Sequence, residues 1–169
     1  PTAVINFDGT TNTNTSMPAD MSGAVGPDHF FQLVNVHFQV FNKSGASLYG
    51  PANTNTIWTG FGGQCQNANN GDGVVLYDAQ ANRWLLAQFV TQSSPYGVCL
   101  AVTTSANPLG SWYRYFFQMN NGATQVYDYP RLAIWRDGYY LTANRFDGAT
   151  MTSFYGPAIV AFNRQQMLN

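Results

Sequence analysis

Three aspartates recur along this chain with the same companions, and this recurrence limits the fold more than any other feature. Asp20, Asp72 and Asp128 lie 52 and 56 residues apart. About eleven residues after each comes an aromatic pair or its equivalent, at 30–31, 83–84 and 139–140. An apolar run then leads to a side-chain amide 15 or 16 residues past the aspartate, and these amides are Asn35, Gln88 and Asn144. Such a period indicates repeated copies of one structural unit.

Each unit has the pattern of short strands separated by turns. In the middle unit, apolar runs at 74–77, 84–90, 98–102 and 111–117 alternate with turns rich in Gly, Pro and Asn, which is typical of antiparallel strands. The flanking units repeat this order, with strands expected at 30–35, 38–41, 48–49, 132–135, 139–146 and 158–162. Aromatic residues make up 15% of the chain and Glu is absent, a composition that favours strands and turns over helices. Only residues 164–168 favour a short helical turn.

A unit of four strands and about 40–55 residues has the size of a β-propeller blade. We therefore predict a single all-β domain of about three four-stranded β-propeller blades, an incomplete propeller. The approximate blades are 17–57, 66–118 and 124–169. A β-sandwich also spaces short strands evenly, but it does not predict the same spacing from aspartate to amide three times.

Three blades do not close a ring, because propellers typically have 4–8. Either the rest of the ring is missing from this sequence, which we favour, or a second copy supplies it through open sheet edges. Within the opening segment 1–16, residues 3–7 are expected to form a strand that completes a blade in either arrangement. The chain starts at Pro1 without Met, so we expect a processed form or a fragment.

Six motifs lie close together along the chain: Gly-Ala-Val-Gly-Pro-Asp-His-Phe-Phe-Gln at 23–32, Trp-Thr-Gly-Phe-Gly-Gly-Gln-Cys at 58–65, Gly-Asp-Gly-Val-Val-Leu-Tyr-Asp at 71–78, Arg-Trp-Leu-Leu at 83–86, Asp-Tyr-Pro at 128–130 and Asp-Gly-Tyr-Tyr at 137–140. Together they resemble a family of secreted bacterial β-propeller-like proteins. The resemblance covers nearly the whole chain and implies a fold and a secreted location, without an established reaction. Family members are usually longer, and they carry Pro where Gly73 stands here, which loosens the entry to the strand.

A weaker likeness concerns a single unit. Asp-Tyr-Pro followed by Asp-Gly-Tyr-Tyr-Leu-Thr is similar to one blade of the five-bladed glycoside hydrolases. In those enzymes an aspartate on the inner strand faces the substrate pocket on the axis. This similarity implies only the position in a blade from which an aspartate would face a ligand on the axis.

If the units are blades, Asp20, Asp72 and Asp128 converge near a central channel, where they repel one another unless something offsets their charge. Three readings stay open. Each aspartate caps its own turn, or the three hold a hard cation such as Ca²⁺, or they bind a polar ligand together with Asn35, Gln88 and Asn144. The amides are also expected to hydrogen-bond the carboxylates.

Catalysis has little support in the sequence. A glycosidase needs two carboxyl groups, one of them protonated near neutral pH, and without Glu the pair would be Asp72 and Asp128. The two histidines, His29 and His37, have no obvious nucleophile beside them, so we expect surface or capping roles.

Aromatic rings are further candidates for ligand contact, because exposed rings stack on sugars. Trp58 lies in a loop beside glycine residues and is the tryptophan most expected to be exposed. Trp84, Trp112 and Trp135 are expected to fill the space between blades.

The remaining composition limits location and partners. The net charge is −1, with no basic stripe, so no nucleic-acid footprint is present, and no apolar run is long enough to span a membrane. Cys65 and Cys99 are expected to pair in an extracellular setting, with buried free thiols as the alternative.

The first functional hypothesis is a secreted module that binds glycans or other cell-surface ligands. A self-assembling structural protein is second, and a glycosidase with axial aspartates is third.

Overall fold

The computed structural model describes residues 2–11 and 16–169. The described residues form three antiparallel sheets that follow one another along the chain. The first sheet contains β1 (Ser22–Val25), β2 (His29–Val34), β3 (His37–Asn42) and β4 (Ser47–Asn53). The second contains β5 (Val74–Asp78), β6 (Arg83–Val90), β7 (Gly97–Thr103) and β8 (Trp112–Gln118). The third contains β9 (Gln125–Ile134), β10 (Gly138–Asp147) and β11 (Phe154–Asn163).

Short helices connect or end these sheets. The 3₁₀-helix η1 (Thr54–Trp58) and the helix α1 (Gly63–Asn67) lie between the first and second sheets, and α2 (Arg164–Met167) follows β11. Within each sheet, every strand pairs with the next strand of the chain, through connections of two to eight residues. This meander is the connection expected when turn residues separate strands of similar length.

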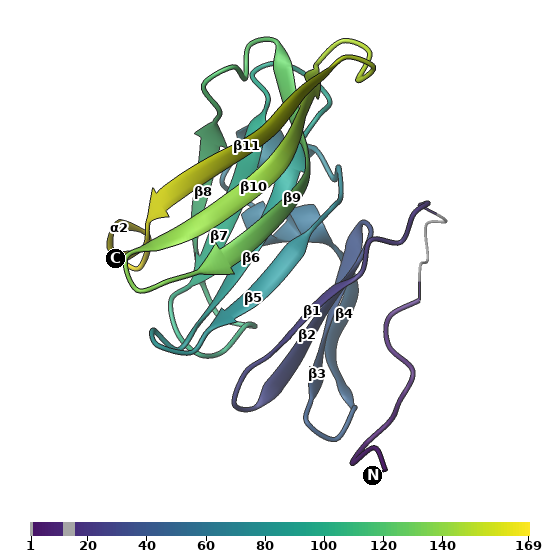
Figure 1. Ribbon diagram of the computed structural model, residues 1–169. Coiled ribbons are helices and arrows are strands. Elements are labelled where there is room, and N and C mark those ends of the chain that lie inside the picture. The colour runs from purple at the N-terminus through teal and green to yellow at the C-terminus, as the bar shows by residue number, and fades with distance from the viewer. Residues whose placement is uncertain (1, 12–15) are drawn as a thin grey trace.

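The second sheet lies between the other two and is buried on both faces (Figure 1). Neighbouring side chains of a strand point to opposite faces, so Leu86 packs toward the first sheet and Leu85 toward the third. This arrangement explains why every residue of β7 is buried, and why its sequence shows no alternation of polar and apolar residues.

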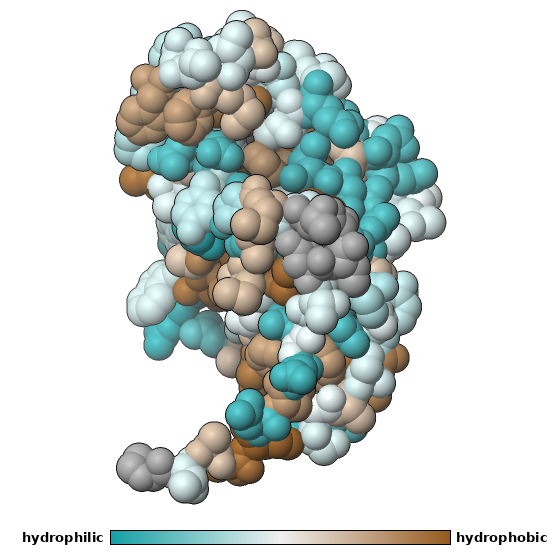
Figure 2. Space-filling model, turned by 90° about the vertical axis from the view of Figure 1, so that its right-hand side faces the viewer, coloured by the Kyte–Doolittle hydropathy of each residue, from teal (hydrophilic) through white to brown (hydrophobic). Residues whose placement is uncertain are grey.

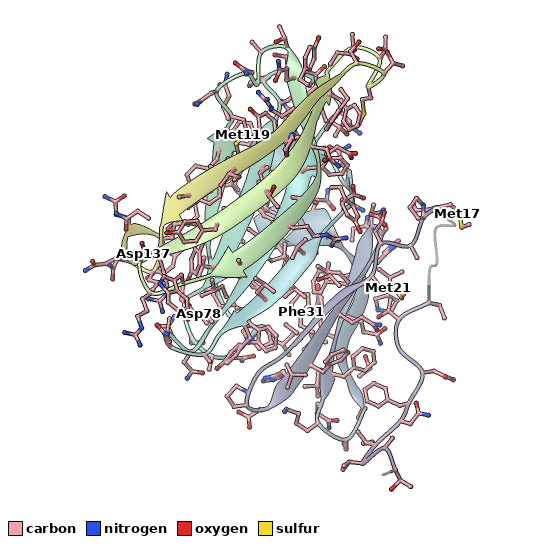
Figure 3. All side chains as sticks on the ribbon, viewed as in Figure 1. Met17, Met21, Phe31, Asp78, Met119 and Asp137 are labelled. Carbon is pink, nitrogen blue, oxygen red and sulfur yellow. A yellow bond between two sulfur atoms is a disulfide. The ribbon has the colours of Figure 1, made fainter. Side chains whose placement is uncertain are left out.

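Aromatic packing joins the first two sheets. Phe31 of β2 stacks on Phe38 with ring centroids 5.1 Å apart, and lies 5.9 Å from Trp84 of β6. Figure 3 shows Phe31 between the two sheets. On the opposite face of the second sheet, Leu85 and Leu100 belong to a separate core that also contains Tyr139 and Leu141 of β10.

The three sheets spread like a fan. Their first strands lie side by side, because β1 packs against β5 and β5 packs against β9. Their last strands are separated by clefts, one of about 370 Å³ between β4 and β8 and one of about 660 Å³ between β8 and β11. The second cleft is lined by residues of both edge strands, from Phe117 to Asn163.

The all-β prediction and the expected strand positions are confirmed, and residues 164–167 form the predicted helical turn. Two details differ from the expected four-stranded blades. The third sheet has three strands, as expected from 132–135, 139–146 and 158–162, and so is not a full four-stranded blade. Residues 3–7 belong to no strand, and Figure 2 shows this N-terminal segment extending from the lower edge of the molecule. Residues 1 and 12–15 of the opening segment lie outside the described residues.

The predicted disulfide is present. Cys65 of α1 and Cys99 of β7 are joined, with their Cα atoms 5.7 Å apart, and both are buried. The bond fastens the connection between the first two sheets onto the second sheet. Among the described residues, no helix is long and apolar enough to cross a membrane.

A buried ion pair joins the second sheet to the third. Asp78, at the end of β5 (Figure 3), accepts hydrogen bonds from Nε of Arg164 at 2.6 Å and from the Tyr139 hydroxyl at 2.9 Å. The backbone N–H groups of Gln80 and Ala81 also donate to it. Burial raises the pKa of Asp78, but the hydrogen bonds from Arg164, Ala81 and Tyr139 outweigh burial and hold the pKa below its ordinary value.

Replacing Arg164 with Met should destabilise the fold, because it leaves the Asp78 carboxylate buried without its cation. We expect a loss of about 3 kcal/mol at neutral pH, as for other broken buried pairs. Because the folded-state pKa of Asp78 lies below its usual 3.8, this stabilisation is present above that pH and is lost as the pH falls through the folded-state pKa. Urea unfolding at pH 7 and pH 3 measures both effects. The matched control is Arg136→Met, at an exposed turn. Equal midpoints for Arg164→Met and wild type at pH 7 would contradict the role of the pair.

Candidate functional site

The three recurring aspartates lie where the three sheets meet. Asp20 and Asp72 each stand two residues before the first strand of their sheet, and Asp128 lies within β9. Because β1, β5 and β9 lie side by side, the carboxylates come close enough for Asp20 and Asp128 to act on the charge of Asp72. We call Asp20, Asp72 and Asp128 the carboxylate cluster.

Asn35 is the polar centre of this cluster. Its Nδ2 lies 3.4 Å from Oδ2 of Asp20 and 3.3 Å from Oδ1 of Asp72, in two long hydrogen bonds. Its Oδ1 accepts a shorter bond, at 2.9 Å, from the backbone N–H of Asp72. One amide in the turn between β2 and β3 therefore joins the inner ends of the first and second sheets.

The backbone beside Asn35 leaves no room for a further side chain. Gly71 has a φ of +105°, and a Cβ atom there would collide with Oδ1 of Asn35. Asp20 and Asp72 have φ values of +34° and +47°, in the left-handed region that ordinary residues rarely adopt. The backbone is thus held in an unfavourable conformation at two of the three carboxylates.

Asp128 reaches the cluster through a β-bulge. Asn144 faces Asp128 and Thr142 faces Arg131 across the pair of β10 and β9, so Tyr129 and Pro130 together oppose Ala143. Tyr129 has a φ of +51°. A bulge of this kind bends its strand and re-aims a side chain. Asp128 and Asn144 face each other across the two strands, but the described residues contain no hydrogen bond between these two side chains, contrary to the expectation for the amides.

Gln88 does not join the cluster, contrary to our expectation for the amides. Val74 faces Ala87 in the register of β5 and β6, so Phe89 faces the position of Asp72, and Gln88 is one residue short. A shift of one residue moves a side chain to the other face of the sheet. Gln88 is buried there, and its Nε2 donates to the carbonyl oxygens of Cys65 and Ala68.

The tryptophans are also placed differently from the expectation. Trp58 is fully buried in the core between the first two sheets, because η1 turns the expected loop back onto the core. Trp84 packs between sheets as expected, and Trp112 packs against the same core. Trp135 is 64% exposed, at the turn between β9 and β10.

Tyr129 is a site residue that the recurrence did not single out. The residue follows Asp128 in the chain and is 42% exposed, and the guanidinium carbon of Arg131 lies 3.7 Å from its ring centroid. The only signal in the sequence is its position within the Asp-Tyr-Pro motif. The cluster therefore combines carboxylates with a side-chain amide, and an exposed aromatic residue follows one of the carboxylates in the chain.

Two carboxylates of the cluster have raised pKa values. Burial raises the pKa of Asp72 from its ordinary 3.8 to about 6, and the charges of Asp20 and Asp128 add to this rise. Burial also raises the pKa of Asp128, whereas a hydrogen bond with Asp72 lowers it. Asp72 is therefore the carboxylate of the cluster whose pKa lies nearest to neutral pH.

The structure supports the alternative roles of the three aspartates unequally. The Asp20 and Asp72 carboxylates accept hydrogen bonds from Asn35 rather than capping their own turns. In the described part of the chain, no group of three or more His, Cys, Asp or Glu side chains is arranged to hold a metal ion. The alternative of a Ca²⁺ ion on Asp20, Asp72 and Asp128 therefore gains no support.

Neither protein-family models nor curated proteins give a match to this chain.

The side-chain carboxyl of Asp72 should titrate near pH 6, and Asp20→Asn should lower its pKa by removing one neighbouring charge. A ¹³C NMR titration of the aspartate carboxyl carbons measures both values.

Since the folded-state pKa of Asp72 lies above its ordinary 3.8, its contribution to stability is complete below that pH and disappears as the pH rises through about 6. Asp72→Asn should therefore flatten the pH dependence of stability in this window. Asp137→Asn, at an exposed turn, is the control. An Asp72 pKa near 4 in the wild type would contradict the proximity of the carboxylates.

Proposed function

We propose that this chain is part of a secreted β-propeller that binds a glycan at the carboxylate cluster. The observation that carries the proposal is the convergence of Asp20, Asp72 and Asp128, each from the inner end of a different sheet. Three sheets whose first strands meet and whose last strands diverge are the arrangement of neighbouring propeller blades. Sites where several blades contribute one residue each lie on the axis of such a fold.

The chemistry of the cluster suits a sugar. Ionised carboxylates only accept hydrogen bonds, and neighbouring sugar hydroxyls donate them. Asn144 adds an amide whose side chain makes no hydrogen bond within the described residues, and Tyr129 adds an exposed ring on which the apolar face of a sugar stacks. A few convergent polar groups beside an aromatic ring are typical of small-ligand sites.

Binding is better supported than hydrolysis. Glycosidases hold their two carboxyl groups about 5–9.5 Å apart, with the sugar or a water molecule between them. The charges of Asp20 and Asp128 both act on Asp72, so the cluster is a group of three neighbouring carboxylates rather than an isolated pair. The expected catalytic pair, Asp72 and Asp128, belongs to this group of three.

The extracellular location is supported by the disulfide between Cys65 and Cys99, because disulfides persist in oxidising compartments. The proposed ligand site needs neither a metal nor a nucleophile. A glycan or another cell-surface ligand is the partner that this combination favours.

Glycan binding can be tested on an array of neutral oligosaccharides, followed by calorimetry with the strongest ligand. Asp128→Asn removes a charged acceptor and keeps the shape of the side chain, so affinity should fall by about tenfold or more. Tyr129→Ala should weaken binding through loss of stacking. The matched control is Asp28→Asn, an exposed aspartate in the turn between β1 and β2, which should bind as the wild type does. The proposal fails if no neutral glycan binds, or if Asp128→Asn and Tyr129→Ala leave the affinity unchanged.

A second candidate, self-assembly, is favoured by the outer strand of the third sheet. β11 pairs only with β10 in the described structure, so the backbone groups of its other edge are free to pair with another chain. Phe154, Tyr155 and Ile159 on this strand are exposed, Ile159 by 84%. Exposed apolar residues on a long unpaired edge are a common cause of association.

Assembly through β11 predicts a concentration-dependent increase in mass. Ile159→Lys places a charge on the edge strand and should return the protein to monomers, whereas Met151→Lys, in the neighbouring turn, should not. Light scattering coupled to gel filtration, over at least a hundredfold range of concentration, measures this. A monomeric wild type at every concentration excludes this second candidate.

A further inference from the structure

The cleft between the first and second sheets lies away from the carboxylate cluster and has a different chemistry. It opens between β4 and β8, at the outer ends of the sheets, and holds about 370 Å³. Protein sites for small ligands have volumes of about 300–1,000 Å³, so one or two sugar rings fit. The inference below does not depend on the carboxylate cluster.

The aromatic rings of this cleft are fixed by the core behind them. Phe38 stacks on Tyr49 with centroids 5.6 Å apart and an interplanar angle of 24°, and Trp112 meets Phe31 edge-on at 6.3 Å. The indole Nε1 of Trp112 donates to the carbonyl oxygen of Pro108 at 3.2 Å. Tyr49 is 47% exposed. Rings held in this way present an apolar surface that loses little entropy when a ligand stacks on it.

One positive charge stands beside these rings. Trp112 and Arg114 are two residues apart on β8 and therefore share the face directed toward the first sheet. Arg114 is half-buried and, among the described residues, is the only charged one that lines the cleft. One guanidinium nitrogen, Nη1, donates to the carbonyl oxygen of Thr59 at 2.5 Å, which fixes the position of the group.

Arg114 has no acidic partner in the described part of the chain, where the ion pair of Asp78 and Arg164 is the one salt bridge. Its remaining N–H groups make no hydrogen bond to described residues. A guanidinium with free N–H groups recognises a carboxylate through two parallel hydrogen bonds. The hydroxyl groups of Thr56 and Ser111 also line the cleft and are available to sugar hydroxyls as acceptors.

We propose that this cleft binds an acidic sugar, with a pyranose ring on Tyr49 and Trp112 and its carboxylate on Arg114. The charge complementarity selects the acid, and the flat rings select a cyclic ligand with an apolar face. An acidic peptide would satisfy Arg114 but would gain little from two rings fixed beside it. The cleft is thus a second binding site, of opposite charge preference to the carboxylate cluster.

The test compares ligands that differ only in charge. Trigalacturonate and its methyl ester form one pair, and 3′-sialyllactose and lactose form the other, so that the two pairs distinguish uronic acids from sialic acids. Calorimetry on the wild-type chain should give at least tenfold tighter binding of the acidic member of one pair. The preference should weaken as salt is raised, because the contact is an ion pair.

Two variants assign that preference to the cleft. Arg114→Gln keeps a donor for the Thr59 carbonyl but removes the charge, and it should abolish the acidic preference. Tyr49→Ala, at an exposed position, should weaken binding of the acidic and neutral members alike. Arg136→Gln, at an exposed arginine elsewhere, should leave the preference intact.

The inference is overturned if no acidic ligand is preferred, or if the preference survives Arg114→Gln. It is also overturned if a tripeptide of glutamates binds as tightly as the acidic sugar, because the rings would then contribute nothing. Circular dichroism and the unfolding midpoint of each variant show whether its fold is intact. A loss of neutral-glycan binding in Asp128→Asn alone concerns the carboxylate cluster and leaves the cleft unaffected.

Discussion

The burial of the second sheet on both faces is the constraint on which the rest of the structure depends. Leu85 and Leu86 point in opposite directions from one strand, and each belongs to a different core. Removing either neighbouring sheet would expose one of these apolar faces to water, at about 25 cal/mol for each Å². The first and third sheets are therefore held on either side of the second, and the single buried amide between them, Gln88, donates to backbone carbonyls of the connecting segment.

This stacking gives the molecule two ends with different properties. At the inner end, β1, β5 and β9 are adjacent, and the residues before or within these strands come together as the carboxylate cluster. At the outer end the sheets diverge, because each is twisted relative to its neighbour, and clefts open between their last strands. The inner end is acidic, whereas the cleft between β4 and β8 carries the unpaired cation Arg114. The same arrangement of the three sheets therefore gives the inner end a negative charge and the cleft between β4 and β8 a positive one.

The strands and the meeting of the three aspartates were predictable, because both follow from local patterns and from the repeat. The position of each amide relative to the aspartates was not predictable, because a shift of one residue in the strand register moves the amide to the other face of its sheet. Sixteen residues separate Asp128 from Asn144 and also Asp72 from Gln88. Only the bulge at Tyr129 and Pro130 makes that spacing bring the first pair face to face. The burial of Trp58 was equally hidden, since a loop rich in glycine gives no periodicity from which a short 3₁₀-helix is recognised.

The carboxylate cluster is unfavourable for the fold taken alone. Asp20 and Asp72 occupy left-handed backbone conformations, which destabilise a residue other than glycine by about 1–3 kcal/mol, and ionised carboxylates at this distance repel one another. Gly71 is confined by the contact with Asn35, so the surroundings maintain the arrangement instead of relaxing it. Glycine or asparagine at the two positive-φ aspartate positions would relieve the strain, and neutral residues would relieve the repulsion. Conflicts between local preference and global fold of this kind concentrate at functional sites, and the recurrence of aspartate in all three units places the conflict at the one point that the three sheets share.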